Sequence, residues 1–83
     1  MQLVVVKFAD PTFYDYWACL EEVDESKVRF CYAAGWLLEE NDQEVKIGML
    51  TTADKHQVRT WAVIPTEAVR ELTVIKEVDW ADA

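Results

Sequence analysis

The stretch from Val28 to Leu50, VRFCYAAGWLLEENDQEVKIGML, decides the fold. It holds two apolar-rich runs separated by the polar residues 39–43, which is typical of a β-hairpin. We expect the core face of the first arm to carry, at period two, Val28, Phe30, Tyr32, Ala34, Trp36 and Leu38. In the second arm the corresponding residues are Val45, Ile47 and Met49. Gly35 interrupts the first arm, and an isolated glycine in a strand marks a bend or a bulge.

Three further strands flank this hairpin. Leu3 to Phe8 is β-branched and stops at Asp10-Pro11. The stronger apolar face of this strand carries Val4, Val6 and Phe8. Val58 to Ile64 stops at Pro65, because proline cannot donate to a ladder. Val69 to Lys76 follows after too few residues for an α-helix, which predicts a single 3₁₀ turn. The prediction is one all-β domain over residues 1–76 with an acidic tail over residues 77–83.

The long first connection carries helix signals. Asp10 is a good N-cap and Pro11 suits the first helical position. The helical spacing i, i+3, i+4, i+7 is met by Phe13, Tyr16, Trp17 and Leu20. This predicts a short helix over roughly residues 11–22. The rival interpretation is another strand, because four residues of the segment are aromatic and alternate loosely.

Composition bounds the assembly and the partners. A chain of 83 residues is one domain, and it buries only about 60% of its unfolded surface. Yet 52% of its residues are hydrophobic, more than one small core easily holds. Two strands are apolar on both faces, which predicts a homo-oligomer whose interface includes Leu3, Val5, Trp61 and Val63. A ring closed by edge-strand pairing is one such assembly. The net charge of −8 disfavours nucleic acid and anionic membranes.

Location and redox state follow from short signals. The opening apolar run is cut by Lys7 and no small-residue cleavage site follows, so a signal peptide is not expected. No stretch has the length of a membrane span, and a cytoplasmic protein is predicted. Cys19 and Cys31 have neither CxxC spacing nor histidine partners, so buried apolar thiols are expected, with a disulfide only if the chain is exported.

The order of elements resembles a known family. Five strands with one 3₁₀ turn over Ile64 to Val69 are similar to the Src-homology-3-type and Sm-like small barrels, which implies a five-stranded barrel. More narrowly, residues 35–42 with Val45 and Ile47, then Ile64-Pro65 with Ala68-Val69, resemble short uncharacterised bacteriophage proteins over about residues 4–75. This resemblance implies a fold and an origin, and no activity.

An Sm-like chain would form a ring that binds RNA. Gly35 with Leu37 and the acidic turn after them is similar to the first Sm motif, but the basic residue and glycine of the second motif have no counterpart near Val63 to Pro65. A ring could still collect positive charge on one face, from Lys46, Lys55, Arg59 and Arg70. RNA binding at these residues is the alternative function.

Catalytic and metal signatures are missing from the sequence. His56 has Asp54 two residues away in a polar loop but no nucleophile, so a solvated histidine is the favoured interpretation. Cys31 lies two positions from Arg29 without a motif around it, which favours a packed cysteine. The acidic clusters at residues 21–25 and 39–44 lack the pattern of a calcium loop. No cofactor, metal or enzyme activity is predicted.

The aromatic residues of the first connection are the candidate site. For Phe13 and Trp17, a plug over the core is slightly favoured over an exposed position. Tyr14 and Tyr16 cannot both share that face of a helix, so at least one is exposed. Exposed aromatics are common interface anchors, which predicts a protein-binding site at Tyr14, Tyr16 and Trp17. Acidic neighbours would steer the site to a basic protein surface. The predicted function is a non-enzymatic module that binds protein.

Overall fold

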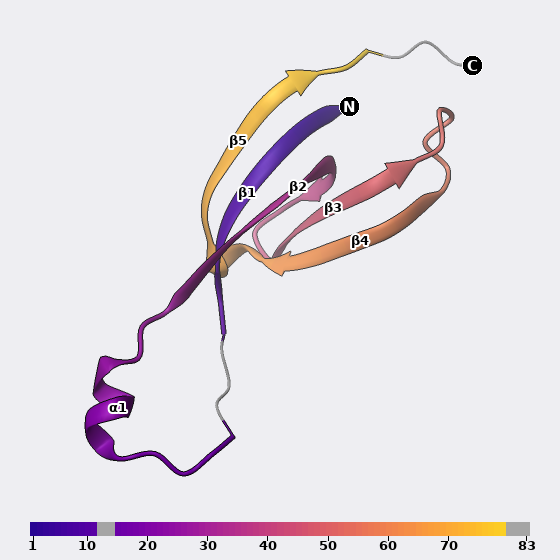
Figure 1. The fold of residues 1–83 in the computed structure, drawn as a ribbon. Coiled ribbons are helices and arrows are strands. Elements are labelled where there is room, and N and C mark those ends of the chain that lie inside the picture. The colour runs from indigo at the N-terminus through magenta and orange to yellow at the C-terminus, as the bar shows by residue number, and fades with distance from the viewer. Residues whose placement is uncertain (12–14, 80–83) are drawn as a thin grey trace.

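A computed structural model describes residues 1–11 and 15–79 of the chain. One antiparallel sheet of five strands has the order β4-β3-β2-β1-β5 (Figure 1). Its strands are β1 (Gln2–Asp10), β2 (Arg29–Glu40), β3 (Glu44–Thr51), β4 (Val58–Pro65) and β5 (Val69–Glu77). One short helix, α1 (Leu20–Glu25), and one 3₁₀ turn, η1 (Thr66–Ala68), complete it. The predicted β class, strand number and 3₁₀ turn are confirmed. Within the described residues no ladder joins β4 to β5, so the sheet is open between them.

The central hairpin turns at Asn41. The Asn41 side-chain Oδ1 accepts hydrogen bonds from the backbone N–H groups of Gln43 (2.8 Å) and Glu44 (2.9 Å). Asparagine favours turns because its side chain bonds the backbone two residues ahead. Thr66 of η1 contacts the same turn. Its hydroxyl donates to the Asn41 carbonyl oxygen (2.7 Å), and its N–H donates to the Gln43 carbonyl oxygen (3.0 Å). The corner formed by the end of β4, η1 and the start of β5 is therefore tied to the β2–β3 turn.

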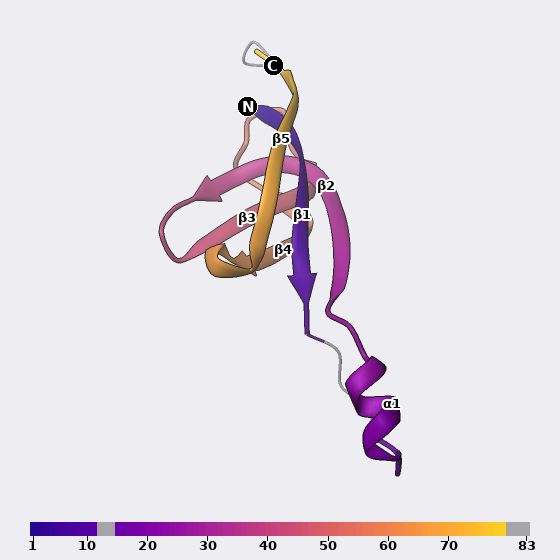
Figure 2. The ribbon, with the colours of Figure 1, turned by 90° about the vertical axis from the view of Figure 1, so that its left-hand side faces the viewer.

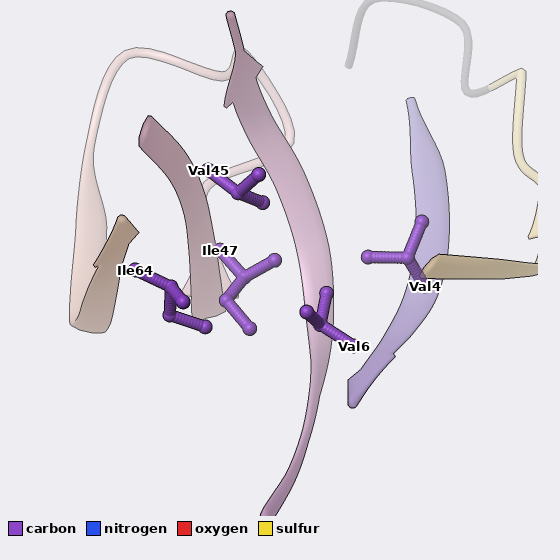
Figure 3. Close-up of a cluster of buried hydrophobic side chains, with 5 residues drawn as sticks. All are labelled: Val4, Val6, Val45, Ile47 and Ile64. Carbon is purple, nitrogen blue, oxygen red and sulfur yellow. The ribbon is translucent and has the colours of Figure 1, made fainter. Parts of the chain in front are cut away.

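Five side chains are buried in the core, from β1, β3 and β4 (Figure 3): Val4, Val6, Val45, Ile47 and Ile64. Partly buried residues pack around them: Phe8, Ala33, Leu37, Ala62, Ala68, Val69 and Leu72. The predicted core faces of β1 and of the first half of β3 are confirmed. Met49 is exposed, so its predicted burial is wrong: it lies beyond the buried cluster, toward the β3–β4 loop.

The predicted core face of β2 is wrong. Phe30 and Tyr32 are exposed, whereas Gly35 is buried and Ala33 packs against the core. The reason is the register with β1, where Val4 lies opposite Gly35 and Val6 opposite Ala33. Residues directly opposite each other point to the same face of a sheet. Burial of the valines therefore sends the row of small residues inward and the aromatic row outward.

Gly35 permits a close approach between β2 and β3, and Figure 2 shows β2 curving over the sheet. A Cβ added at Gly35 would lie 2.6 Å from the carbonyl oxygen of Gly48. A register shift follows between Leu37 and Glu39. The close approach is thus at Gly35, and the register irregularity lies between Leu37 and Glu39.

The predicted helix over residues 11–22 is wrong in position. The helix is Leu20–Glu25, and Tyr16 and Trp17 precede it in irregular backbone, so the rival strand is not formed there either. Asp10 is the last residue of β1 and pairs with Arg29, so Asp10 does not cap a helix. Phe13 and Tyr14 lie outside the described residues. Strand pairing that extends to Asp10 therefore overrides the local capping signal.

Residues 15–28, here called the arm, extend away from the sheet (Figures 1 and 2). The chain measures 58 × 21 × 20 Å. Its radius of gyration is 16.6 Å, against about 12 Å for a compact chain of this length. Its shape is therefore that of a small sheet with a projecting segment.

Candidate functional site

The arm presents large apolar side chains to solvent. Trp17 is fully exposed at 103%, Leu20 is 80% exposed and Tyr16 is 65% exposed. The expectation that Trp17 plugs the core is wrong, because the arm leaves the sheet instead of folding over it. The exposure expected for at least one of Tyr14 and Tyr16 is met by Tyr16. Tyr14 lies outside the described residues.

Helix α1 lacks the support that stabilises short helices. None of its six residues is buried, and its N-cap residue Cys19 makes no side-chain capping bond. At the first turn, the Cys19 carbonyl oxygen accepts hydrogen bonds from the N–H groups of Glu22 (3.1 Å) and Val23 (3.3 Å). Helices shorter than about 12 residues are marginal in water without tertiary packing. Helix α1 therefore has little stabilising contact with the rest of the described chain.

A groove of about 870 Å³ lies between the arm and the corner. The arm side of the groove contributes Tyr16 and Val23, and the corner contributes Val63, Pro65 and Ala68. Its charged lining includes the basic residues Lys27, Arg29 and Arg70 and the acidic residues Asp10, Glu22 and Glu67. The guanidinium of Arg70 donates to the carbonyl oxygen of Glu67 (2.8 Å), which holds this cation at the corner. The groove therefore combines apolar side chains with basic and acidic side chains along its lining.

A second apolar surface covers the face of the sheet opposite the core. Leu3 lies opposite Trp36, Trp36 opposite Gly48, and Gly48 opposite Trp61, so one row crosses four strands. Val63 and Trp61 are exposed, while Leu3 and Val5 are half-buried. The four predicted interface residues therefore share one face, but two strands separate the β1 pair from the β4 pair. Trp36, which the sequence placed in the core, belongs to the row between them.

The outer face also carries a cation over aromatic rings. The Lys7 ammonium lies 5.2 Å from the ring centre of Phe30 and 5.9 Å from that of Tyr32. Such contacts are worth about 0.5–1 kcal/mol at exposed sites. The sequence prediction placed Phe30 and Tyr32 in the core. Their exposure follows from the pairing of β2 with β1, which alternation within β2 alone does not indicate.

The four basic residues of the RNA alternative are not gathered in one chain. Arg70 lies at the start of β5, in the corner that follows the end of β4, whereas Lys55 lies in the loop that precedes β4. A strand of eight residues separates these positions by about 24 Å. The ammonium of Lys46 is already paired with the carboxylates of Glu39 (2.8 Å) and Glu44 (3.1 Å). Arg59 is exposed on β4. A single subunit offers no continuous basic track along these residues.

The ion pair of Lys46 predicts a measurable pH dependence. The hydrogen bond from Lys46 and its charge lower the pKa of Glu39 below its usual value, and the same contacts raise the pKa of Lys46. A carboxylate with a depressed folded pKa adds stability that is fully present above its unfolded pKa and is lost as the pH falls through its folded pKa. We expect Lys46→Met to move the Glu39 pKa up toward the ordinary value of 4.5 in a carboxyl-detected NMR titration.

The matched control is Lys76→Met on β5, which should leave the Glu39 titration in place. Above the unfolded pKa of Glu39, Lys46→Met should be slightly less stable than the wild type, and the two should converge in acid. An unmoved Glu39 pKa in Lys46→Met would contradict the ion pair.

His56 and the cysteines show no catalytic arrangement. The carboxylate of Asp54 accepts from the Thr52 hydroxyl and the His56 N–H, bonds that lower the pKa of Asp54 and organise the loop backbone. His56 is exposed. Cys19 is exposed, so its expected burial is wrong, and Cys31 is half-buried with its thiol 3.7 Å from Asp10 Oδ2. Neither Cys19 nor Cys31 forms a disulfide within the described residues.

Residues 1–11 and 15–79 contain neither a metal-binding cluster nor a membrane-spanning helix. No group of three or more His, Cys, Asp or Glu side chains is placed to hold a metal ion there. No helix in this part of the chain has the length and apolar character needed to cross a membrane. In comparisons with known proteins, no family model, no curated protein and no solved structure matches the chain.

Proposed function

We propose that this chain is a non-enzymatic interaction module that works by binding protein through its arm. The observation that carries the proposal is Trp17, which is fully exposed on a segment with no core of its own. Tryptophan is the residue most enriched at binding hot spots, because it buries a large area and loses few rotamers. Tyr16 and Leu20 lie beside it in sequence and are also exposed. Tyr14 belongs to the same proposed site.

The charge of the arm supports a basic partner surface. Helix α1 carries four acidic side chains and no basic one: Glu21, Glu22, Asp24 and Glu25. A cluster of one sign speeds encounter with the opposite sign and discourages like-charged surfaces. The steering depends on salt, because exposed charges are screened beyond about 8 Å at physiological ionic strength.

We also propose that the chain is related to the small barrels of the Src-homology-3 or Sm-like type, of the kind found in bacteriophage proteins, and that it acts in the cytoplasm. The features that support the barrel type are the 3₁₀ corner between the last two strands and the contact of Thr66 with the Asn41 turn. The free edges of β4 and β5 and the outer apolar face suit self-association through Leu3, Val5, Trp61 and Val63. An Sm-like ring that binds RNA is the weaker proposal, because its basic residues lie apart.

Affinity capture with arm variants tests the proposed function. Tagged wild-type protein is compared with a Tyr14→Ala/Trp17→Ala double variant and with Met49→Ala, an exposed apolar residue outside the arm, as the control. We expect the proteins captured by the wild type to be lost with the arm variant and kept with the control. Fluorescence anisotropy with labelled single-stranded RNA is run in parallel. Capture that is indifferent to the arm substitutions, or tight and salt-sensitive RNA binding, would reject the proposal.

A further inference from the structure

The chain exposes more surface than its mass requires. Its accessible surface is 6756 Å² for 9.6 kDa. A compact monomer of that mass exposes about 5,100 Å². The excess of about 1,700 Å² is twice the roughly 800 Å² that each partner buries in a standard interface. The arm, with its exposed aromatic and aliphatic side chains, accounts for the projecting shape. An excess of this size is enough surface for one subunit to bury in a stable dimer.

The groove has the size of the arm's own helix. A helix of six residues is about 9 Å long and 10 Å across, which corresponds to about 700 Å³. The groove measures about 870 Å³. The chain's own α1 cannot fill it, because Glu22 and Val23 of α1 already form one wall. A second copy of α1 would fit between that wall and the corner.

The two sides of the arm are suited to such an arrangement. Tyr16 lines the groove of its own chain, whereas Trp17 is fully exposed and does not line it. If each arm enters the groove of the other chain, the two arms lie side by side between the two corners. Each arm then packs against the corner of the other chain. The Tyr16 sides of the two arms then face each other, and each Trp17 faces the opposite corner. One two-fold operation satisfies both surfaces at once, as an isologous interface requires.

We propose that two copies of this chain exchange arms reciprocally, each arm lying in the groove of the other copy, with Trp17 against Pro65 and Ala68 of the partner subunit. This inference rests on the proposed function, whose binding surface it keeps, and it names a second copy as the partner. The groove lining holds three basic residues, Lys27, Arg29 and Arg70, beside three acidic ones, Asp10, Glu22 and Glu67, so basic side chains are available to the acidic residues of an entering α1.

Light scattering on the full chain is the first test. We expect a mass of twice 9.6 kDa at micromolar concentration. Trp17→Ala should weaken dimerisation about thirtyfold, the effect of losing a hot-spot aromatic. Arg70→Glu should also weaken it, through the groove. Met49→Ala, at an exposed position outside both the groove and the outer face, is the control that should leave the dimer intact, and Trp61→Ala tests the outer face. Circular dichroism of each variant checks that the sheet is retained.

Crosslinking places the arm. Cys19 is a native exposed thiol at the start of α1, so Glu67→Cys in a Cys31→Ser background puts one more thiol at the corner. Oxidation should give a covalent dimer under denaturing, non-reducing conditions. A crosslinked monomer would mean that the arm closes on its own groove, and it would overturn the exchange. A chain that stays monomeric and uncrosslinked would overturn it too.

The outcomes separate the two proposals. A monomer that still captures another protein through Tyr14 and Trp17 rejects the second copy as partner and leaves the proposed function standing. A dimer that Trp61→Ala disrupts and Trp17→Ala does not rejects arm exchange in favour of the sheet face. A monomer whose captured proteins are indifferent to the arm rejects both.

Discussion

Gly35→Ala should lower the free energy of unfolding by about 2–3 kcal/mol, the upper range for inserting a methyl group into packed structure. The new Cβ would lie 2.6 Å from the carbonyl oxygen of Gly48, which is backbone and cannot rotate away. Two strands would have to separate, and the β2–β3 ladder contains both glycines. For a domain near the low end of the usual stability range, about 5 kcal/mol, half of the stability would be lost. Urea denaturation followed by tryptophan fluorescence measures the change.

Gly48→Ala is the matched control. Its new Cβ would lie 2.5 Å from the Val58 methyl Cγ2 and 3.1 Å from Leu38 Cδ1, so two side chains at partly exposed positions would have to shift instead of backbone. We therefore expect a distinctly smaller loss than for Gly35→Ala. Equal losses for both variants, or a loss below about 0.5 kcal/mol for Gly35→Ala, would show that the backbone contact at Gly35 does not limit the fold.

Ile47→Ala should cost about 3 kcal/mol, within the 2–5 kcal/mol found when a buried aliphatic side chain is cut to alanine. Ile47 is 4% exposed and is one of only five buried side chains in the described core. It lies between β2 and β4, so the cavity would open at the centre of the sheet's inner face. With so few buried residues, little else can close over the gap. Chemical denaturation gives the value directly.

Met49→Ala, two residues along the same strand, provides the comparison. Strand alternation alone assigns Met49 and Ile47 to one face, but Met49 is exposed. We expect a change of less than about 0.5 kcal/mol, as for other surface substitutions. A loss at Met49 as large as that at Ile47 would mean that the core extends further toward the β3–β4 loop than described.

The strands were predictable because their signals are local. Proline ends β4 at Pro65, the three residues of η1 are too few for an α-helix, and alternation marks Val45 and Ile47. The inward face of β2 was not predictable in this way, since both of its alternating rows are apolar. What settles that face is pairing with β1, a contact between distant parts of the sequence.

The candidate site was predictable in composition and not in geometry. Aromatic residues beside acidic ones indicated an interaction surface, and Tyr16 and Trp17 are exposed in the structure. The helix signals at Asp10 and Pro11 were misleading, because Asp10 pairs with Arg29 in the β1–β2 ladder. The groove has no sequence signal of its own, since it depends on where the arm lies relative to Pro65 and Ala68. The number of apolar residues did indicate that some would remain outside the core.

The place of β1 between β2 and β5 has a consequence for how the chain folds. The strands β2, β3 and β4 are consecutive hairpins, so their contacts close short loops. The ladder between β1 and β5 joins Val4 to Val74, which are 74 − 4 = 70 residues apart. Closing so long a loop carries a larger entropic cost, which slows the formation of the contact. While a ribosome makes the chain, β1 can pair with β2 early, but its other edge stays open until β5 emerges. During that interval the growing chain exposes a valine-rich edge that a chaperone or a neighbouring nascent chain can bind.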